Sequence, residues 1–234
     1  IGLLSRTGIV PISNTLDTPG PMTKSVLDNA IFLSAMTGND DEDTSTLNVI
    51  ATVDYLKDLN TSTMKGKRLG VMRDLLSDSI YKKNIELLQK AGAIIVEFEP
   101  IQLQLDGFLT LLNIDMKYDL PKYLSTYADK SLKIKSIEDI IQINIKDSLQ
   151  RAPYGQQLFN GILKDATTLA ELEIVKNNLS SKGKQFFNEP MDSLNLEAIL
   201  SINNYHAGYA AVAKYPALTV PMGYKKTGEP ISLT

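Results

Sequence analysis

The chain contains a single imidazole, His206, and a Ser–His–Asp hydrolase built from this sequence would have to use it as the base. The G-x-S-x-G segment that presents a serine nucleophile beside an oxyanion hole does not occur in the sequence. His206 follows Asn203-Asn204-Tyr205 and opens a run of small residues. We therefore predict that His206 is a partly buried, hydrogen-bonded structural residue.

A second pattern, Ser62-Thr-Met-Lys65, matches the S-x-x-K segment of penicillin-binding enzymes, and Ser77-Asp78 and Lys226-Thr-Gly228 follow in the expected order. A lysine one helical turn from a serine could deprotonate it, provided that the serine begins a buried helix. Here Gly66 and a strand-like apolar run follow at once, and S-x-x-K occurs three times in the chain. We interpret the match as a coincidence, which labelling of Ser62 by a β-lactam would contradict.

The acidic run Asn39-Asp-Asp-Glu-Asp43 invites comparison with a calcium loop, but an EF-hand needs alternating ligands, a central glycine and a final glutamate. That spacing is not present, so we expect a solvated loop after the end of a helix. The sequence has no cysteine and one histidine, which excludes disulfides, thiolate metal sites and multi-histidine sites. It also has no G-x-G-x-x-G or Walker segment. We therefore expect neither a metal nor a cofactor.

The composition is that of an ordinary globular protein. Of 234 residues, 43% are apolar and 22% are charged, and 24 Lys+Arg against 27 Asp+Glu give a net charge of −3. This mildly acidic balance gives no electrostatic reason to expect a nucleic acid or an anionic membrane as a partner. No apolar run in the sequence approaches the length that a membrane-spanning helix needs.

The spacing of apolar residues changes along the chain, and it predicts which segments are helices and which are strands. A helix is expected from Thr23, as its cap, to about Thr37, and a short amphipathic turn around 50–59. Arg68–Met72 and Ala93–Phe98 are apolar runs on either side of a helical stretch. This spacing predicts a βαβ unit with parallel strands and a right-handed crossover.

Residues 106–188 have a mostly helical pattern. Ser136 and Asp139 predict a capping box for a helix over 137–149, and Pro121 and Pro153-Tyr-Gly155 are expected to interrupt the helical run.

The last part of the chain returns to mixed structure. It contains a buried strand within Leu196–Ile202, a short helix over His206–Ala213 and a hairpin of Leu218–Met222 with Ile231–Leu233. Strands on both sides of a helical segment indicate an α/β fold.

Two further segments fit none of the chemical patterns above. They are Leu4-Ser-Arg-Thr-Gly-Ile-Val-Pro-Ile-Ser13, followed by Leu16-Asp-Thr-Pro-Gly-Pro-Met22, and Tyr215-Pro-Ala-Leu-Thr-Val-Pro-Met-Gly223, followed by Gly228-Glu-Pro-Ile-Ser-Leu233. Together they resemble the amidase signature family, with its GLVSRxGIxPxSxxxDxxGPMTRTVxDAA and YPxxTVPxGxxxGxPxGL stretches. Lys65–Val71 and Ala93–Glu97 are similar to the family's LKGKRIGV and GAEVVEV, in the same order.

The resemblance implies an α/β/α sandwich around a large mixed sheet, of which this chain would be a part that is incomplete at both ends. Residues 1–234 would then form a partial amidase domain. Its expected parts are a loop and helix that follow a missing nucleophile turn (1–60), the βαβ unit (61–100), a helical insert (101–190) and returning strands (191–234).

The resemblance also implies a C–N hydrolase with a Ser–cis-Ser–Lys triad and an acyl-enzyme intermediate. In the family, all three triad residues lie upstream of the GLVSR stretch, so this sequence begins after them. No catalytic residue is therefore assigned here, and Ser5, Ser13 and Ser25 are not candidates for the triad. We expect the complete enzyme to act on a small-molecule amide and this piece to be inactive alone.

One wall of the site is what this chain would contribute. The turn at Asp17, Thr18 and Gly20 is expected to lie close to the triad, where Asp17 would either orient it or close its own turn as an Asx residue. Asn113, Lys117 and Tyr118, in the helical insert, are candidate lining residues whose simpler interpretation is a surface face.

A different class of function stays open, since a non-catalytic binding or scaffold protein could retain half of the amidase fold. For the amidase fragment, the expected partner is the missing N-terminal part of the same protein. Separated from its N-terminal strands, the chain would expose a long apolar edge and face, so we predict self-association or partial disorder of the isolated chain. The composition favours a cytoplasmic location.

Overall fold

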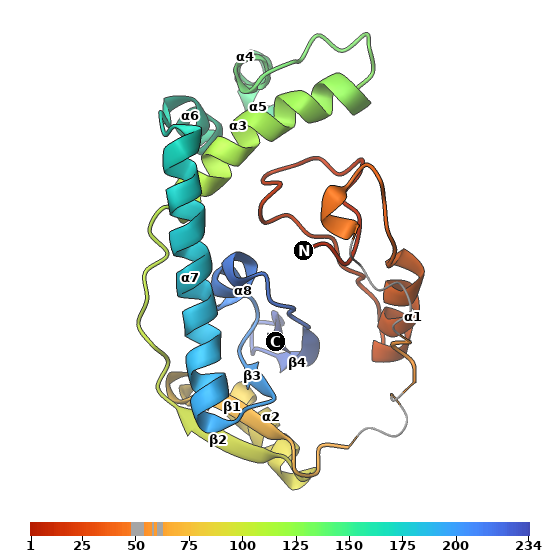
Figure 1. The fold of residues 1–234 in the computed structure, drawn as a ribbon, viewed down its shortest axis with the longest axis vertical. Helices are drawn as coiled ribbons and strands as arrows, with labels where there is room; N and C mark the ends of the chain where they lie inside the picture. Colours follow the sequence, from red (N-terminus) through yellow and green to blue (C-terminus); the bar gives the residue numbers. More distant parts are fainter. Residues whose placement is uncertain (48–53, 58, 60–62) are drawn as a thin grey trace. The chain divides into compact units, whose positions relative to one another are not determined.

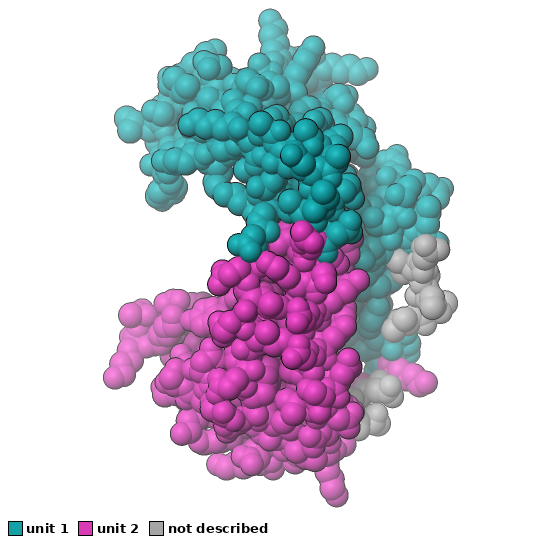
Figure 2. Space-filling view, turned by 60° about the vertical axis from the view of Figure 1, so that its left-hand side comes forward, with its two compact units in different colours: residues 1–56, 106–177 teal, residues 57–105, 178–234 magenta. Residues whose placement is uncertain are grey.

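The computed structural model describes residues 1–47, 54–57, 59 and 63–234 (Figure 1). The predicted turn around 50–59 and Ser62 of the S-x-x-K match therefore fall partly or wholly outside the described residues. The chain divides into two compact units, residues 1–56 with 106–177 (unit 1) and residues 57–105 with 178–234 (unit 2), coloured separately in Figure 2. Each unit is built from two separate segments of the chain.

Unit 2 contains the predicted βαβ unit. Strand β1 (Arg68–Met72), helix α2 (Ser79–Lys90) and strand β2 (Ile94–Phe98) follow one another, and β1 pairs with β2 in parallel. Strand β3 (Ala198–Leu200) pairs in parallel with the other edge of β1, which gives the order β2-β1-β3. The 3-10 turn η2 (Arg73–Ser77) leads from β1 to Asp78, which caps α2 by accepting hydrogen bonds from the backbone of Ile80 and Tyr81.

The core of unit 2 forms where the sheet meets helices and a hairpin. Strands β4 (Val220–Tyr224) and β5 (Pro230–Leu233) are antiparallel, which confirms the predicted hairpin, and α8 spans Ala207–Ala213. The buried side chains of this core come from β1, α2, the end of α7 (Leu169–Leu194) and both hairpin strands; they include Val71, Met72, Tyr81, Ile85, Phe186, Met222 and Ile231.

Unit 1 is mostly helical in the part of it that the structure describes. Its elements are α1 (Val26–Met36), η1 (Thr44–Thr46), α3 (Phe108–Tyr127), α4 (Ile137–Lys146), α5 (Ser148–Arg151), α6 (Gln157–Lys164) and the first turns of α7. Leu120 of α3, Ile137 and Ile141 of α4, and Ile162 of α6 form its buried cluster. The predicted capping box at Ser136 and Asp139 is confirmed, and the predicted break at 153–155 lies between α5 and α6.

Three predicted helix boundaries are wrong. Pro121 lies inside a continuous α3. A proline inside a helix costs about 3 kcal/mol. Leu120, Tyr123 and Leu124, on both sides of Pro121, pack against the buried residues of α4 and α6, and this burial offsets that cost. Helix α1 is capped by Ser25 rather than Thr23, since the Ser25 side chain accepts the Asp28 amide hydrogen bond. Helix α4 ends at Lys146 because Asp147 leaves the helical conformation, with φ −150°.

The architecture is therefore α/β, with a parallel sheet, a separate antiparallel hairpin and helices. Among the described residues, no helix has the length and apolar character that crossing a bilayer would require.

Candidate functional site

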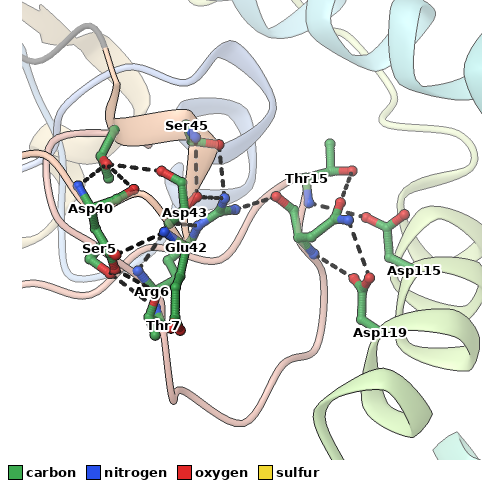
Figure 3. A network of polar contacts seen from close by, with 12 residues as sticks. Ser5, Arg6, Thr7, Thr15, Asp40, Glu42, Asp43, Ser45, Asp115 and Asp119 are labelled. Carbon is green, nitrogen blue, oxygen red and sulfur yellow. Dashed lines mark hydrogen bonds and ion pairs between the residues drawn. The ribbon is translucent and has the colours of Figure 1, made fainter. Parts of the chain in front are cut away.

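The N-terminal loop is fastened to the loop before η1 by a bidentate arginine–carboxylate pair (Figure 3). Arg6 donates from Nε to Asp43 Oδ2 at 2.8 Å and from Nη2 to Asp43 Oδ1 at 2.6 Å, and its backbone N–H donates to the same carboxylate at 3.0 Å. Asp43 is 7% exposed and caps η1. The hydrogen bond from Arg6 holds the pKa of Asp43 far below its usual value. This fork geometry is the strong form of such a pair, so it fixes the entry of the loop.

Asp40 extends the same anchor. Ser5 Oγ and Thr7 Oγ1 each donate to Asp40 Oδ2 at 2.5 Å, and these bonds, that from Ser5 first, lower the pKa of Asp40. The expectation of a solvated acidic loop at 39–43 is therefore wrong for Asp43, which is buried, while Asp40 is half-buried and hydrogen-bonded. Their hydrogen-bond donors lie more than thirty residues upstream in the chain. The local sequence around residues 39–43 therefore could not predict these contacts.

Six consecutive backbone N–H groups, from residue 12 to residue 17, are all hydrogen-bonded. Asp17 Oδ2 accepts from Ile12 at 2.8 Å and from Ser13 at 2.9 Å, while the amides of Leu16 and Asp17 donate back to the Ser13 carbonyl. Within the described chain, Asp17 thus closes its own loop, which is one of the two roles predicted for it. These hydrogen bonds satisfy the amides of an irregular segment that is not part of a strand or helix, and they restrict its conformation.

The remaining two amides of this stretch bind carboxylates of α3. The Thr15 N–H donates to Asp115 Oδ2 at 3.3 Å, and the Asn14 N–H donates to Asp119 Oδ2 at 2.7 Å. Asp115 and Asp119 are one helical turn apart, and Figure 3 shows both carboxylates facing the loop that carries Thr15. Burial, with the nearby charges of Asp115 and Asp17, raises the pKa of Asp119.

Ser13 makes the most deeply buried polar contact of this loop. Its Oγ donates to Asp115 Oδ2 at 2.5 Å; Ser13 is 0% exposed and Asp115 5% exposed. Lys176 Nζ lies 3.3 Å from Asp115 Oδ1 and compensates its charge. A serine enclosed in this way cannot meet a substrate, which agrees with leaving Ser13 out of the catalytic residues.

The other predicted wall residues lie on the surface of unit 1. Thr18 is exposed, and its hydroxyl makes a long hydrogen bond of 3.4 Å to the Pro19 carbonyl. Gly20 is also exposed, and a Cβ added there would meet no atom within 4 Å. Thr18 and Gly20 therefore lie in an exposed segment that follows the hydrogen-bonded loop.

Two of the three candidate lining residues of α3 are brought together. Asn113 Nδ2 donates to Asp165 Oδ2 at 3.1 Å, and Lys117 Nζ donates to the Asp165 carbonyl at 2.9 Å. Burial acts to raise the pKa of Asp165, but hydrogen bonds from Thr167 and Asn113 outweigh it and lower that pKa. Tyr118 is 56% exposed on another face of the helix, as the simpler interpretation predicted.

The structural role predicted for His206 is confirmed in unit 2. Its Nδ1 lies 2.6 Å from Ser201 Oγ, and its ring stacks on Phe186 with centroids 5.5 Å apart. Burial lowers the pKa of His206, so the neutral imidazole is favoured. Ser201 is itself buried and is not a free nucleophile.

Within the described ranges, no group of three or more His, Asp or Glu side chains is arranged to hold a metal ion. The residues that sequence reasoning missed are Asp115, Asp119 and Lys176. Aspartates spaced i and i+4 between apolar residues of one helix were the available signal for a buried polar face.

Comparisons with known proteins agree with this architecture. A protein of Arabidopsis thaliana named "Probable amidase" is 28% identical over 246 residues, covering all of this chain and 47% of the relative. The crystal structure of an amidase family protein from Bacillus anthracis superposes with a TM-score of 0.89 at 36% identity, covering 99% of this chain and 47% of that chain. The native peptide amidase from Stenotrophomonas maltophilia gives a TM-score of 0.87 at 31% identity, covering 99% and 52%.

The chain thus spans about half the length of the relatives that it matches. The sequence profile of the family described as Amidase matches residues 1–201, which include the anchored N-terminal loop, α3 and all three parallel strands. Since that match covers well over half of the sequence, the chain belongs to the amidase family.

Proposed function

We propose that this chain is the post-catalytic part of an amidase that hydrolyses a carboxamide C–N bond. In this proposal a Ser–cis-Ser–Lys triad stands upstream of Ile1 and forms an acyl-enzyme, and residues 1–234 belong to one partial amidase domain. The chain alone is then inactive, because an oxyanion site cannot form without the residues that flank the nucleophile. The N-terminal part of the same protein is its partner.

The observation that carries the proposal is the fixed loop of residues 4–17. A segment that resembles the amidase signature is held by the Arg6–Asp43 pair and by the α3 carboxylates, with all six amides of residues 12–17 bonded. So many polar contacts on an irregular loop, one of them fully buried, are typical of a segment that must keep one geometry beside a reaction centre.

The remaining features of the loop support a wall rather than a catalytic centre. Its serines Ser5 and Ser13 already donate to Asp40 and Asp115. Thr18 and Gly20 follow as an exposed turn that a substrate could reach. In the proposed enzyme this turn lines the amide pocket, while the nucleophile and base come from the preceding segment.

The test begins with the protein isolated from its source. We expect an intact mass about twice the 25.8 kDa of this chain, since the chain spans about half of its relatives. That protein should release ammonia from a small primary amide or from a C-terminally amidated peptide, the second chosen because one structural neighbour is named a peptide amidase.

The isolated 234-residue chain is the matched control and should release no ammonia from either amide. A native mass equal to that of this chain would contradict the enzyme proposal. It would favour the alternative, a non-catalytic binding or scaffold protein. A double-length protein that hydrolyses neither amide would contradict the proposed reaction while leaving the fold assignment intact.

A further inference from the structure

We infer that Asp115 and Lys176, acting through Ser13, are positioning residues for the loop of residues 11–20 in the proposed amidase. The inference rests on the proposed function but adds a role for side chains in the helical segment, far along the chain from the loop. Ser13 and Asp115 are 102 residues apart in sequence, and their side chains are joined by a buried 2.5 Å hydrogen bond.

Asp115 binds the loop at two points. Its Oδ2 accepts the Ser13 hydroxyl and the Thr15 N–H, which lie on either side of Asn14. Ser13 in turn accepts the Leu16 amide on Oγ at 3.1 Å. Displacement of Asp115 would therefore release the Ser13 side chain and the Thr15 amide together. It would also weaken the hold on the Leu16 amide, which would keep its bond to the Ser13 carbonyl.

Lys176 offsets the energetic cost of burying the Asp115 carboxylate. A carboxylate that is 5% exposed loses several kcal/mol of hydration, so it needs a compensating charge. Lys176 Nζ supplies that charge from α7 at 3.3 Å from Oδ1, the oxygen that the loop does not use, and its other anionic neighbour is the exposed Glu173, also at 3.3 Å. The two oxygens of Asp115 are thus divided between the cation and the loop.

The surrounding charges explain why the cation matters. Asp17 and Asp119 also accept loop amides, so three carboxylates converge on residues 12–15. Burial raises the pKa of Asp119, and the nearby charges of Asp115 and Asp17 raise it further by repelling its ionised form. The Lys176 ammonium, 3.3 Å from Asp115 Oδ1, offsets part of this repulsion, so its removal would favour movement of the carboxylates away from one another and from the loop amides that they bind.

The consequence is that α3 and α7 set the geometry of a wall that the loop presents. A loosened loop would widen the pocket beside Thr18 and Gly20. We therefore expect the selectivity between a small amide and a bulky amide to change when this network is broken. That ratio does not depend on how much of the protein is folded, because both substrates meet the same active molecules.

The experiment compares Asp115→Asn, Lys176→Met and their double variant in the complete protein, with Asp129→Asn as a matched control. Asp129 is exposed, and its carboxylate accepts hydrogen bonds from the backbone and side chain of Ser131, outside this network. The measurement is the ratio of kcat/KM for a C-terminally amidated peptide to kcat/KM for a small primary amide. Amide hydrogen exchange of residues 12–17 is followed in the same variants.

We expect Lys176→Met to raise this ratio about tenfold, a typical effect of a change in pocket fit, and to speed exchange at Thr15 and Leu16. The double variant should return toward the parent, because the side-chain carbonyl that Asp115→Asn introduces can still accept from Ser13 and carries no uncompensated charge. Asp129→Asn should leave both measurements unchanged.

Faster exchange with an unchanged ratio would make Asp115 and Lys176 structural contacts only and overturn the inference. Unchanged exchange would overturn it as well. Absence of hydrolysis by the unsubstituted protein would overturn the proposed function, and the inference with it, so the two failures are distinguishable.

Discussion

At the scale of the residue, the Arg6–Asp43 pair makes the stability of unit 1 depend on pH. The folded-state pKa of Asp43 lies below its unfolded value, because Arg6 donates to the ionised carboxylate. The stabilisation is therefore complete above the ordinary aspartate pKa of about 4 and is lost as pH falls below it.

Asp43→Asn should remove this dependence. At pH 7 we expect the free energy of unfolding to fall by about 3 kcal/mol, since the mostly buried Arg6 guanidinium then loses its charged partner. The further decrease in the free energy of unfolding between about pH 7 and pH 3 should be smaller than in the parent. Urea unfolding followed by circular dichroism at both pH values measures this. The neighbouring exposed Asp41→Asn is the control, and equal effects of the two variants would contradict the prediction.

Single residues also mark the limit of sequence reasoning. The role of His206 could be predicted because its neighbours are polar and small, and because the chain holds no other imidazole. The role of Asp43 could not, since the same acidic run would be solvated if Arg6 lay elsewhere. Burial of a charge depends on a partner brought by the fold, and local composition does not contain that partner.

At the scale of the element, Gly183 of α7 allows α8 to approach closely. A Cβ at Gly183 would lie 2.6 Å from Val212 Cγ2, 2.8 Å from the Ala213 nitrogen and 2.8 Å from the Tyr209 carbonyl oxygen. Two of these atoms are backbone and cannot move aside as a side-chain end could. The contact residues of both helices belong to unit 2.

Gly183→Ala should therefore destabilise the protein by about 1–3 kcal/mol through overpacking. Gly161, inside α6, has only the Asn113 amide at 4.0 Å, so Gly161→Ala should stabilise by up to about 1 kcal/mol through helix propensity. Thermal unfolding of the two variants provides the comparison. A melting temperature that rises in both would refute the close-packing argument.

Helices and strands could be predicted where the spacing of apolar residues and the helix-capping residues indicated the same boundaries. Arg68–Met72 and Ile94–Phe98 are short apolar runs beside a capped helix, and they form the parallel pair that the spacing predicted. The continuation of α3 through Pro121 was not predictable, because the apolar contacts that outweigh the proline come from α4 and α6. The polar face of α3 was missed for the same reason, as its partners lie about a hundred residues away.

At the scale of the whole molecule, α1 leaves a large apolar surface without a partner among the described residues. Helix α1 has Ala30 as its one buried residue, and Leu27 and Ile31 are 54% and 49% exposed. A helix that is apolar on several faces is usually buried on all of them. In the proposed amidase, we expect the N-terminal part of the protein to cover this surface.

In the isolated chain the same surface should drive self-association. Leu27→Glu with Ile31→Lys, an i and i+4 charge pair on α1, should shift sedimentation toward a monomer. Leu149→Lys, which changes an apolar residue that is 87% exposed in α5, is the control and should leave the distribution unchanged. If the unsubstituted chain sediments as a monomer, this surface does not drive self-association and the prediction is wrong.

The interleaving of the two units also governs the order in which the chain can fold while it is being synthesised. Strand β1 acquires β2 once Phe98 has emerged, but its opposite edge waits for β3, about 100 residues later. At ribosomal rates of about 5–20 residues per second, that edge stays open for about 5–20 seconds. Unit 1 is meanwhile completed at residue 177, before β3 is made. The core of unit 2 is therefore finished after unit 1, and this interval is when a holding chaperone would protect it most.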